Sequence, residues 1–304
     1  MPYQAYREQK RGGKGVIGAD LATGDFIKQL ISCSTHDYLL LFTQRGRVFW
    51  LKAYQVPEAQ RYGRGQALVN LLNLKEDNIT SVIPIKEFKN GFLFMVTKLG
   101  VVKKMKLEMF SNPRASGVRA INLPLDNTDT LIDVSVIQPG QEVMMTTSDG
   151  QAIRFNSDEV RDMGRASYGV TWIKLEKGDE VVSQVVVTNP KEETVLTVTQ
   201  DGYGKRSLVD DYRVTSRACK GVINLKVTGK NGKVVRTISV VDSDQIIVST
   251  EKGIMIKTPV KDIRVMGRAT QGVRVIRLSD GDHISDVAKL SKEDDDEQVR
   301  EPNP

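Results

Sequence analysis

The stretch LLLFTQRGRVFWLK, residues 39–52, holds two apolar runs of strand length on either side of the tetrad Thr-x-x-Gly. The glycine of such a tetrad can take the positive φ that closes a short hairpin turn. The tetrad follows an apolar run four more times along the chain. The five copies are TQRG at 43–46, TKLG at 97–100, TSDG at 147–150, TQDG at 199–202 and TEKG at 250–253. The sequence therefore predicts five β-hairpins that recur every 50 to 54 residues.

A second glycine recurs at a nearly fixed distance after each hairpin glycine. These loop glycines follow by 17 or 19 residues, and in four of the five cases a valine comes next and begins another apolar stretch. They are Gly65, Gly117, Gly169, Gly221 and Gly272. Gly15 lies 50 residues before Gly65 and is followed by Val16, so residues 9–15 form a sixth copy of the loop without a Thr-x-x-Gly hairpin ahead of it. We therefore expect the first repeat to be incomplete on its N-terminal side.

The repeat decides the expected fold. No long stretch has the 3.6-residue periodicity of a helix, and the 304 residues divide into about five and a half β-rich units of about 52 residues. Such units fit four-stranded blades around a ring. A β-sandwich or two stacked barrels is the alternative, but a strict period across the whole chain favours the ring. We predict an all-β, propeller-like single domain over residues 1–290.

The charge is divided unevenly along the chain. The net charge of +6 includes the segment SKEDDDEQVREPNP, residues 291–304, which has six acids and two bases. Residues 1–290 therefore hold 42 bases and 32 acids, a net charge of +10. A body this basic favours a polyanionic partner, and we expect the acidic tail to be a short disordered end.

The six loops share an arginine three or four residues before the glycine. These arginines are Arg11, Arg61, Arg114, Arg165, Arg217 and Arg268. Lys14, Arg64 and Lys220 add a second cation directly before the glycine. For any single copy, capping of a neighbouring carbonyl or pairing with an acid would explain the arginine. Six copies in phase on a basic body favour phosphate binding.

The hairpins carry a second set of cations. The residue four positions after the hairpin glycine is a cation in four of the five repeats, namely Lys104, Arg154, Arg206 and Lys257. In the first repeat it is Trp50. A ring repeats its angular positions, so we predict that the loop and hairpin cations form a basic rim that contacts DNA. Aromatic residues make up only 6% of the chain and none recurs in phase, which favours a duplex backbone over single strands stacked base by base.

Other functional classes find little support. Residues 8–15 fail the Walker A pattern, because Glu8 stands where the first glycine should be and Gly15 follows Lys14. Two cysteines and two histidines do not supply a standard zinc site, and no nucleophile, metal site or carboxylate pair stands out. No apolar run approaches the ~18 to 20 residues that span a bilayer. We therefore expect a non-catalytic, cytoplasmic chain without a cofactor or a membrane partner.

The segment QKRGGKG, residues 9–15, resembles the gyrase box that marks the C-terminal domain of the A subunit of bacterial DNA gyrase. The family motif is Gln-Arg-Arg-Gly-Gly-Lys-Gly, and the single departure here is a lysine in place of the first arginine, which keeps the charge. The box residues are Gln9, Lys10, Arg11, Gly12, Gly13, Lys14 and Gly15. The segments STHDYLLLFTQRGRVFWLKAYQVPE (34–58), GYGKR (202–206) and MGRATQGVRVIRL (266–278) are also similar to that family.

This resemblance implies a six-bladed β-pinwheel in which neighbouring blades exchange strands and DNA wraps around the rim. It implies that the box is needed for wrapping and that wrapping lets DNA gyrase, a type II topoisomerase and isomerase, introduce negative supercoils. The implied partners are duplex DNA, the N-terminal breakage-reunion domain of the same subunit and the gyrase B subunit in an A2B2 holoenzyme associated with the nucleoid. ATP and Mg would be bound by other parts of that holoenzyme, and the isolated domain is expected to be a monomer.

Two alternatives remain open. The C-terminal domain of the A subunit of topoisomerase IV shares this fold but has a degraded box, so the near-complete box favours gyrase. A kelch-like propeller that serves as a scaffold for protein partners would also have a period near 50 residues. Kelch blades carry a repeated double glycine, whereas Gly12 and Gly13 are the only adjacent glycines in this chain.

Overall fold

The computed structural model describes residues 16–17, 31, 33–58, 66–72, 74 and 77–290. Each Thr-x-x-Gly tetrad closes an antiparallel β-hairpin, as the sequence predicts. The hairpins are β2 (Tyr38–Thr43) with β3 (Arg47–Lys52), β5 (Phe92–Thr97) with β6 (Val101–Lys106), β9 (Glu142–Thr147) with β10 (Gln151–Asn156), β13 (Thr194–Thr199) with β14 (Tyr203–Leu208), and β17 (Gln245–Thr250) with β18 (Ile254–Pro259).

The turn chemistry explains both recurring positions of the tetrad. The hairpin glycines have φ between +76° and +85°, and each donates its N–H to the carbonyl of its threonine. In four of the five turns the threonine hydroxyl accepts the N–H of the residue after the glycine, as in Arg47 N to Thr43 Oγ1 at 3.0 Å and Gln151 N to Thr147 Oγ1 at 3.1 Å. The threonine therefore fixes the turn that the glycine allows.

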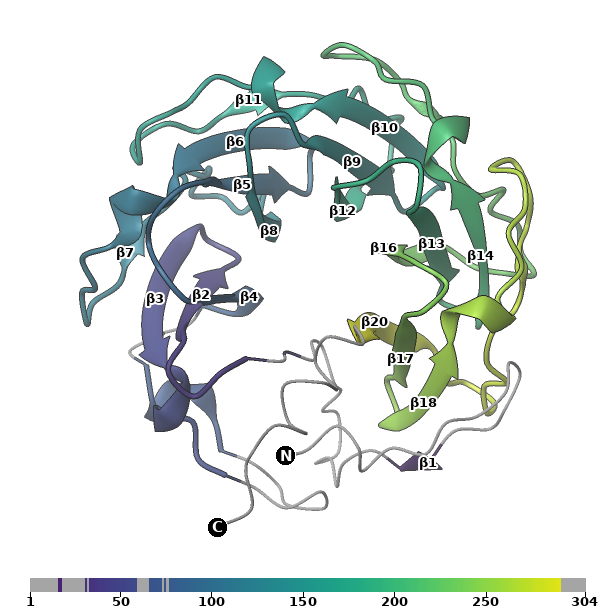
Figure 1. Ribbon diagram of the computed structural model, residues 1–304, viewed down its shortest axis with the longest axis horizontal. Helices are drawn as coiled ribbons and strands as arrows, with labels where there is room; N and C mark the ends of the chain where they lie inside the picture. The colour runs from purple at the N-terminus through teal and green to yellow at the C-terminus, as the bar shows by residue number, and fades with distance from the viewer. Residues whose placement is uncertain are drawn as a thin grey trace.

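Each hairpin forms the middle of a four-stranded antiparallel sheet. The inner strand of each sheet follows its hairpin in the chain, and the five inner strands lie around the axis of the ring (Figure 1). They are β4 (Ile79–Ile85), β8 (Leu131–Ile137), β12 (Val181–Val187), β16 (Val234–Val240) and β20 (Ile284–Leu290). We number the sheets first to fifth in this order.

The outer edge of each sheet comes from a different repeat. A two-residue strand completes each of the first four sheets, and it belongs to the repeat that follows in the chain. β3 pairs with β7 (Val118–Arg119), β6 with β11 (Val170–Thr171), β10 with β15 (Val222–Ile223) and β14 with β19 (Val273–Arg274). In the fifth sheet β1 (Val16–Ile17) takes the same place, with Val16 opposite Met255 of β18. The first described strand therefore completes the last sheet.

The described residues form five four-stranded sheets, so the expectation of six blades is wrong. Each sheet is built on one Thr-x-x-Gly hairpin, and the sequence contains five. The sixth loop copy ends at Gly15 and is followed by β1, which joins the fifth sheet rather than starting another one. The rest of the expectation, an all-β ring of four-stranded sheets, agrees with the arrangement in Figure 1.

A short 3₁₀ turn follows each of the five hairpins. These turns are η2 (Ala53–Gln55), η4 (Leu107–Phe110), η5 (Ser157–Glu159), η6 (Val209–Asp211) and η7 (Val260–Asp262), with η3 (Leu68–Asn70) further along the first repeat. Over the ranges that the structure describes, no helix is long and apolar enough to cross a membrane.

The core lies between neighbouring sheets, and the other face of the first hairpin is covered by apolar residues of its own repeat, such as Leu71 and Leu74. On β2, Leu40 and Phe42 pack in a cluster with Leu93 and Met95 of the second sheet, while Leu39 and Leu41 belong to a separate cluster on the other face. Because both faces are covered, the hairpin strands read as continuous apolar runs instead of alternating ones.

The five inner strands enclose an axial cavity of about 160 Å³. The third residue of each inner strand occupies one equivalent position, next to the register shift that all five sheets share. These residues are Ser81, Asp133, Ser183, Arg236 and Asp286. Hydroxyls on these strands bond across sheet boundaries, as in Thr80 Oγ1 to the Ile132 carbonyl at 3.0 Å and Ser183 Oγ to the Thr237 carbonyl at 2.8 Å.

Candidate nucleic-acid interface

In four of the five repeats, the residue four positions after the hairpin glycine reaches from one sheet to the next. Lys104 Nζ donates to the Ser157 carbonyl at 3.2 Å, and Arg206 donates from Nη1 to the Val260 carbonyl at 3.2 Å. Both acceptors lie in the 3₁₀ turn of the following repeat. Trp50, the apolar member of the set, does the same: its Nε1 donates to the Phe110 carbonyl at 2.8 Å. The position requires an N–H donor that reaches a carbonyl of the next 3₁₀ turn, and charge is secondary, since the indole of Trp50 makes the same contact.

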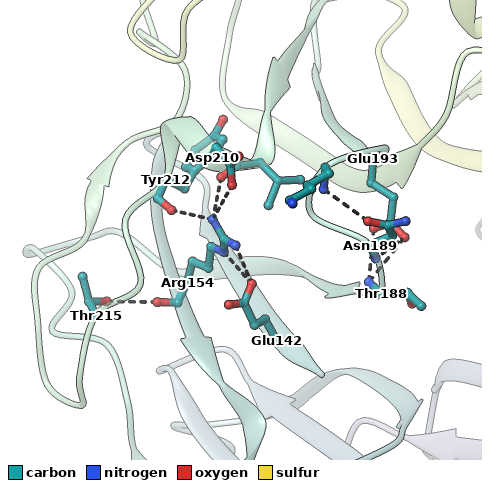
Figure 2. A network of polar contacts seen from close by, with 10 residues as sticks. Glu142, Arg154, Thr188, Asn189, Glu193, Asp210, Tyr212 and Thr215 are labelled. Carbon is teal, nitrogen blue, oxygen red and sulfur yellow. Dashed lines mark hydrogen bonds and ion pairs between the residues drawn. The ribbon is translucent and has the colours of Figure 1, made fainter. Parts of the chain in front are cut away.

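Arg154 shows this contact most fully (Figure 2). Its Nη1 donates to the carbonyls of Val209 and Tyr212, both at 2.9 Å. Its Nε and Nη2 face Glu142 Oε2 at 2.7 and 2.6 Å, and Asp210 lies 3.8 Å from Nη1. The guanidinium is therefore surrounded by two carbonyls and two carboxylates.

Burial gives these hairpin cations a structural role instead of the DNA contact predicted from the sequence. Lys104, Arg154 and Arg206 are 6, 7 and 3% exposed. Each also faces an acid: Asp162 for Lys104, Glu142 for Arg154 and Asp242 for Arg206. A phosphate reaches such a side chain only if these contacts break. Lys257, the fourth predicted member, is half-buried on β18.

The loop arginines are placed differently, on the segments that lead into the outer strands at the periphery of the ring (Figure 1). Arg114, Arg165 and Arg217 are exposed. Arg268 is half-buried and donates from Nη1 to the Ile223 carbonyl at 3.0 Å. Over the described ranges, no acid forms an ion pair with these four guanidiniums, and successive loops therefore offer a cation at the outer edge.

Lys220, Arg61, Arg64 and the box residues complete the predicted set. Lys220 is exposed, but its Nζ contacts Glu176 Oε1 at 2.8 Å, and that hydrogen bond raises the pKa of Lys220. Arg61, Arg64 and residues 9–15 lie outside the described residues. The structure therefore brings together only part of the predicted rim.

Four arginines gather where the outer edges of the first and second sheets meet. Arg47, Arg114, Arg119 and Arg165 line a hollow of about 410 Å³, and no acidic residue of the described part of the chain lines it. Sequence reasoning missed Arg47 and Arg119, because neither recurs in phase in all repeats. We call this site the arginine hollow.

Two buried lysines lie behind the outer edge and were also missed. Lys103 and Lys205 share the third position after their hairpin glycines, and both are 0% exposed. Lys103 Nζ donates to the carbonyls of Ala120, Arg165 and Ser167 at 2.7, 3.0 and 2.9 Å. Burial lowers the pKa of Lys103 to about 8 and that of Lys205 to about 7. Their shared position was the one signal available in the sequence.

Comparison with known proteins places the chain in a family. The family described as "DNA gyrase C-terminal domain, beta-propeller" matches residues 4–34, 37–86, 91–138, 141–188, 193–240 and 244–291. The chain belongs to this family. The first matched segment of the DNA gyrase C-terminal domain falls largely outside the described residues, and the other five coincide with the five hairpin repeats.

Individual relatives agree with the gyrase family. The A subunit of DNA gyrase from Salmonella typhimurium is 43% identical over 301 residues, which cover 98% of this chain and 34% of that protein. The corresponding gyrase protein of Chlamydia trachomatis serovar D is 44% identical over 297 residues, which cover 96% of this chain and 35% of that protein. The chain therefore spans about a third of the length of these curated relatives.

Solved structures show the same architecture. A structure of the DNA gyrase A C-terminal domain superposes with a TM-score of 0.85 at 27% identity and covers 96% of this chain and 95% of that one. A crystal structure of the C-terminal domain of DNA topoisomerase IV gives a TM-score of 0.76 at 30% identity and covers 87% of this chain and 82% of that one.

Proposed function

We propose that this chain binds duplex DNA along its outer-edge loops, without sequence preference, and wraps it around the ring as the C-terminal domain of a DNA gyrase A subunit. The observation that carries the proposal is the recurrence of exposed Arg114, Arg165 and Arg217 at one loop position on successive sheets. Membership of the gyrase family and the net charge of the body support it.

The energy needed to bend DNA explains why several loops must act together. Turning ~40 base pairs through ~180° costs on the order of 10 kcal/mol for an elastic rod with the stiffness of DNA. One exposed arginine contributes far less than this, because water and salt screen it. Cations on successive loops, together with backbone N–H groups at the loop glycines, offset the bending energy jointly. With roughly 6 to 10 phosphates neutralised, affinity should fall by three or more decades between about 50 and 200 mM salt.

The remaining roles concern parts of the chain or of the enzyme that the structure does not describe. We propose that Lys10, Arg11 and Lys14 anchor one end of the wrapped duplex, while Gly12, Gly13 and Gly15 let the backbone approach phosphates closely. In this proposal the chain is a non-catalytic, monomeric cytoplasmic domain of an A2B2 topoisomerase, in which strand breakage and ATP hydrolysis with Mg take place elsewhere.

The test is ligation of nicked plasmid in the presence of the 304-residue chain, followed by measurement of the linking number. Wrapping traps writhe, so the wild type should shift the distribution. We expect Arg165→Ala/Arg217→Ala to reduce the shift in part, and alanines at Lys10, Arg11 and Lys14 to abolish most of it. The control is Lys86→Ala/Lys191→Ala, which removes two exposed lysines outside the outer-edge loops.

The outcomes separate the parts of the proposal. A wild-type chain that leaves the linking number unchanged does not wrap DNA. A shift that survives the box alanines shows that the box is not the anchor. If the Lys86→Ala/Lys191→Ala control reduces the shift as much as Arg165→Ala/Arg217→Ala, DNA responds to overall charge and not to the loop position.

A further inference from the structure

The arginine hollow is unusual in the density of its charge. Arg114, Arg119 and Arg165 are exposed and Arg47 is half-buried, and all four line the same depression. Four guanidiniums line about 410 Å³, and none of the described lining residues is acidic, so their charges repel one another. An anion that enters the hollow removes that repulsion and gains several charge-assisted hydrogen bonds.

The backbone around the hollow is held in place from beneath. Lys103, which is 0% exposed, donates to the Ala120 carbonyl on one side and to the Arg165 and Ser167 carbonyls on the other. Asn122 N also donates to the Ser167 carbonyl at 3.1 Å. These bonds join the segment that carries Arg114 and Arg119 to the loop that carries Arg165. The two walls of the hollow are thus preorganised relative to one another.

Two of the arginines are also oriented individually. The Arg47 guanidinium donates from Nη2 to the carbonyls of Ser116 and Gly117, and its Cζ lies 5.8 Å from the centre of the Phe49 ring. Arg119 donates from Nη1 to Asn122 Oδ1 at 2.7 Å. Among the residues that the structure describes, none forms an ion pair or a side-chain hydrogen bond with the guanidiniums of Arg114 and Arg165. These two guanidiniums can therefore close on an anion.

The next two boundaries along the ring lack this arrangement. Between the third and fourth sheets, Gln151 and Ile223 occupy the positions of Arg47 and Arg119, so only the loop arginines Arg217 and Arg268 remain. Between the second and third sheets the positions are held by Val101 and Thr171, and nearby Lys220 is paired with Glu176. Each loop carries one arginine. Of these three boundaries, only the one between the first and second sheets adds two more arginines, Arg47 and Arg119.

We propose that the arginine hollow grips a single backbone phosphate of the duplex with Arg114 and Arg165 together, and so fixes where the wrapped DNA sits on the rim. At the boundary between the third and fourth sheets each loop arginine contacts its own phosphate. The proposal rests on the proposed function and deepens it. It distinguishes a site where two arginines hold one phosphate from loops where each arginine contacts a phosphate of its own.

A double-mutant cycle on the 304-residue chain tests the grip. The affinity for a duplex of about 40 base pairs is measured by fluorescence anisotropy at about 150 mM salt for Arg114→Ala, Arg165→Ala and the double variant. Each single variant should weaken binding by about 2- to 3-fold, because the other guanidinium of the pair still holds the phosphate. The double variant should weaken it by well over tenfold, more than the product of the two single effects.

Arg217→Ala, Arg268→Ala and their double variant form the matched control, with the same charge change at the same loop position two boundaries away. Their effects should multiply, because the two arginines act on separate phosphates. If the effects of Arg114→Ala and Arg165→Ala also multiply, the hollow is an ordinary part of the rim and the proposal is wrong while DNA binding stands. A wild-type chain that does not bind the duplex at all would remove both the proposed function and the grip.

Discussion

The Arg236 guanidinium lies 3.1 Å from the Asp133 carboxylate, although the two residues belong to sheets that are not neighbours. Arg236 is on β16 and Asp133 on β8, and β12 lies between them in the order around the axis. Arg236 Nε is also 3.7 Å from Asp286 on β20. The charge of Asp133 raises the pKa of Arg236, so the guanidinium stays ionised. One side chain thereby connects three of the five inner strands across the axial cavity.

Removing this cation should destabilise the ring more than removing an exposed one. We expect Arg236→Met to lower the free energy of unfolding by about 3 to 5 kcal/mol, because it leaves the Asp133 carboxylate buried without its partner. Urea denaturation followed by circular dichroism measures the change. The double variant Arg236→Met/Asp133→Asn should recover part of the loss. A loss below about 1 kcal/mol for Arg236→Met would show that the ion pair does not hold the strands together.

Arg154 and Arg217 should separate stability from DNA binding. Arg154→Ala removes the side-chain donor of the Tyr212 carbonyl and leaves the Glu142 carboxylate without its cation, so we expect it to cost about 3 kcal/mol of stability. Because Arg154 is 7% exposed, the folded fraction should bind duplex DNA as the wild type does. Arg217→Ala should do the reverse, with unchanged stability and weaker binding.

Urea denaturation and fluorescence anisotropy on both variants measure these two effects. Arg154→Lys serves as the control, since it keeps the charge but loses the forked donor geometry, and it should recover only part of the stability. If Arg154→Ala weakens DNA binding without any loss of stability, Arg154 contacts DNA, as the sequence predicted.

Alanine substitutions at Gly150 and Gly140 should separate the free-energy cost of a strained backbone conformation from that of a steric clash. Both have positive φ, +84° and +80°. An added Cβ on Gly150 would overlap the Leu225 carbonyl oxygen, whereas one on Gly140 would meet no heavy atom within 4 Å. Gly140→Ala should therefore cost about 1 to 2 kcal/mol from backbone strain alone.

Gly150→Ala should cost at least about 2 kcal/mol more than Gly140→Ala, because Leu225 lies on the neighbouring repeat and its backbone must move. The midpoints of thermal unfolding of the Gly150→Ala and Gly140→Ala variants, each compared with wild type, measure the difference. Equal costs would mean that the positive φ alone, and not the close approach of Leu225, explains the repeated glycine.

Lys205 should make stability depend on pH in the neutral to alkaline range. Burial lowers its pKa from 10.5 to about 7 in the folded chain. Below pH 7 both states carry the proton and the buried ammonium is unfavourable. Between pH 7 and 10.5 the unfolded chain keeps a proton that the folded chain has released, so stability rises with pH.

We therefore expect wild type to gain roughly 2 to 3 kcal/mol relative to Lys205→Met between about pH 6.5 and 9. Urea denaturation of both proteins at the two pH values measures this difference, and other titrating groups cancel in the comparison. Parallel pH profiles for wild type and variant would contradict the release of a proton from Lys205.

The sequence was sufficient for the repeated local structure. A threonine hydroxyl and a glycine with positive φ specify a hairpin turn through bonds within five residues, so the five hairpins and their period followed from the Thr-x-x-Gly tetrads alone. The exposed loop arginines Arg114, Arg165 and Arg217 were likewise found by their phase with the loop glycines. Both kinds of signal are short in range and repeated, and repetition makes them visible in one sequence.

The tertiary structure decided which pairings and which cations matter. The number of sheets depends on whether β1 starts a sheet or completes one, and that depends on Val16 meeting Met255 at the other end of the chain. Exposure could not be read from strand parity either, because a hairpin can be covered on both faces, by a neighbouring sheet or by residues of its own repeat. Arg154 and Arg165 therefore look alike in the sequence, and only the packing of one sheet against the next buries the first and leaves the second at the surface.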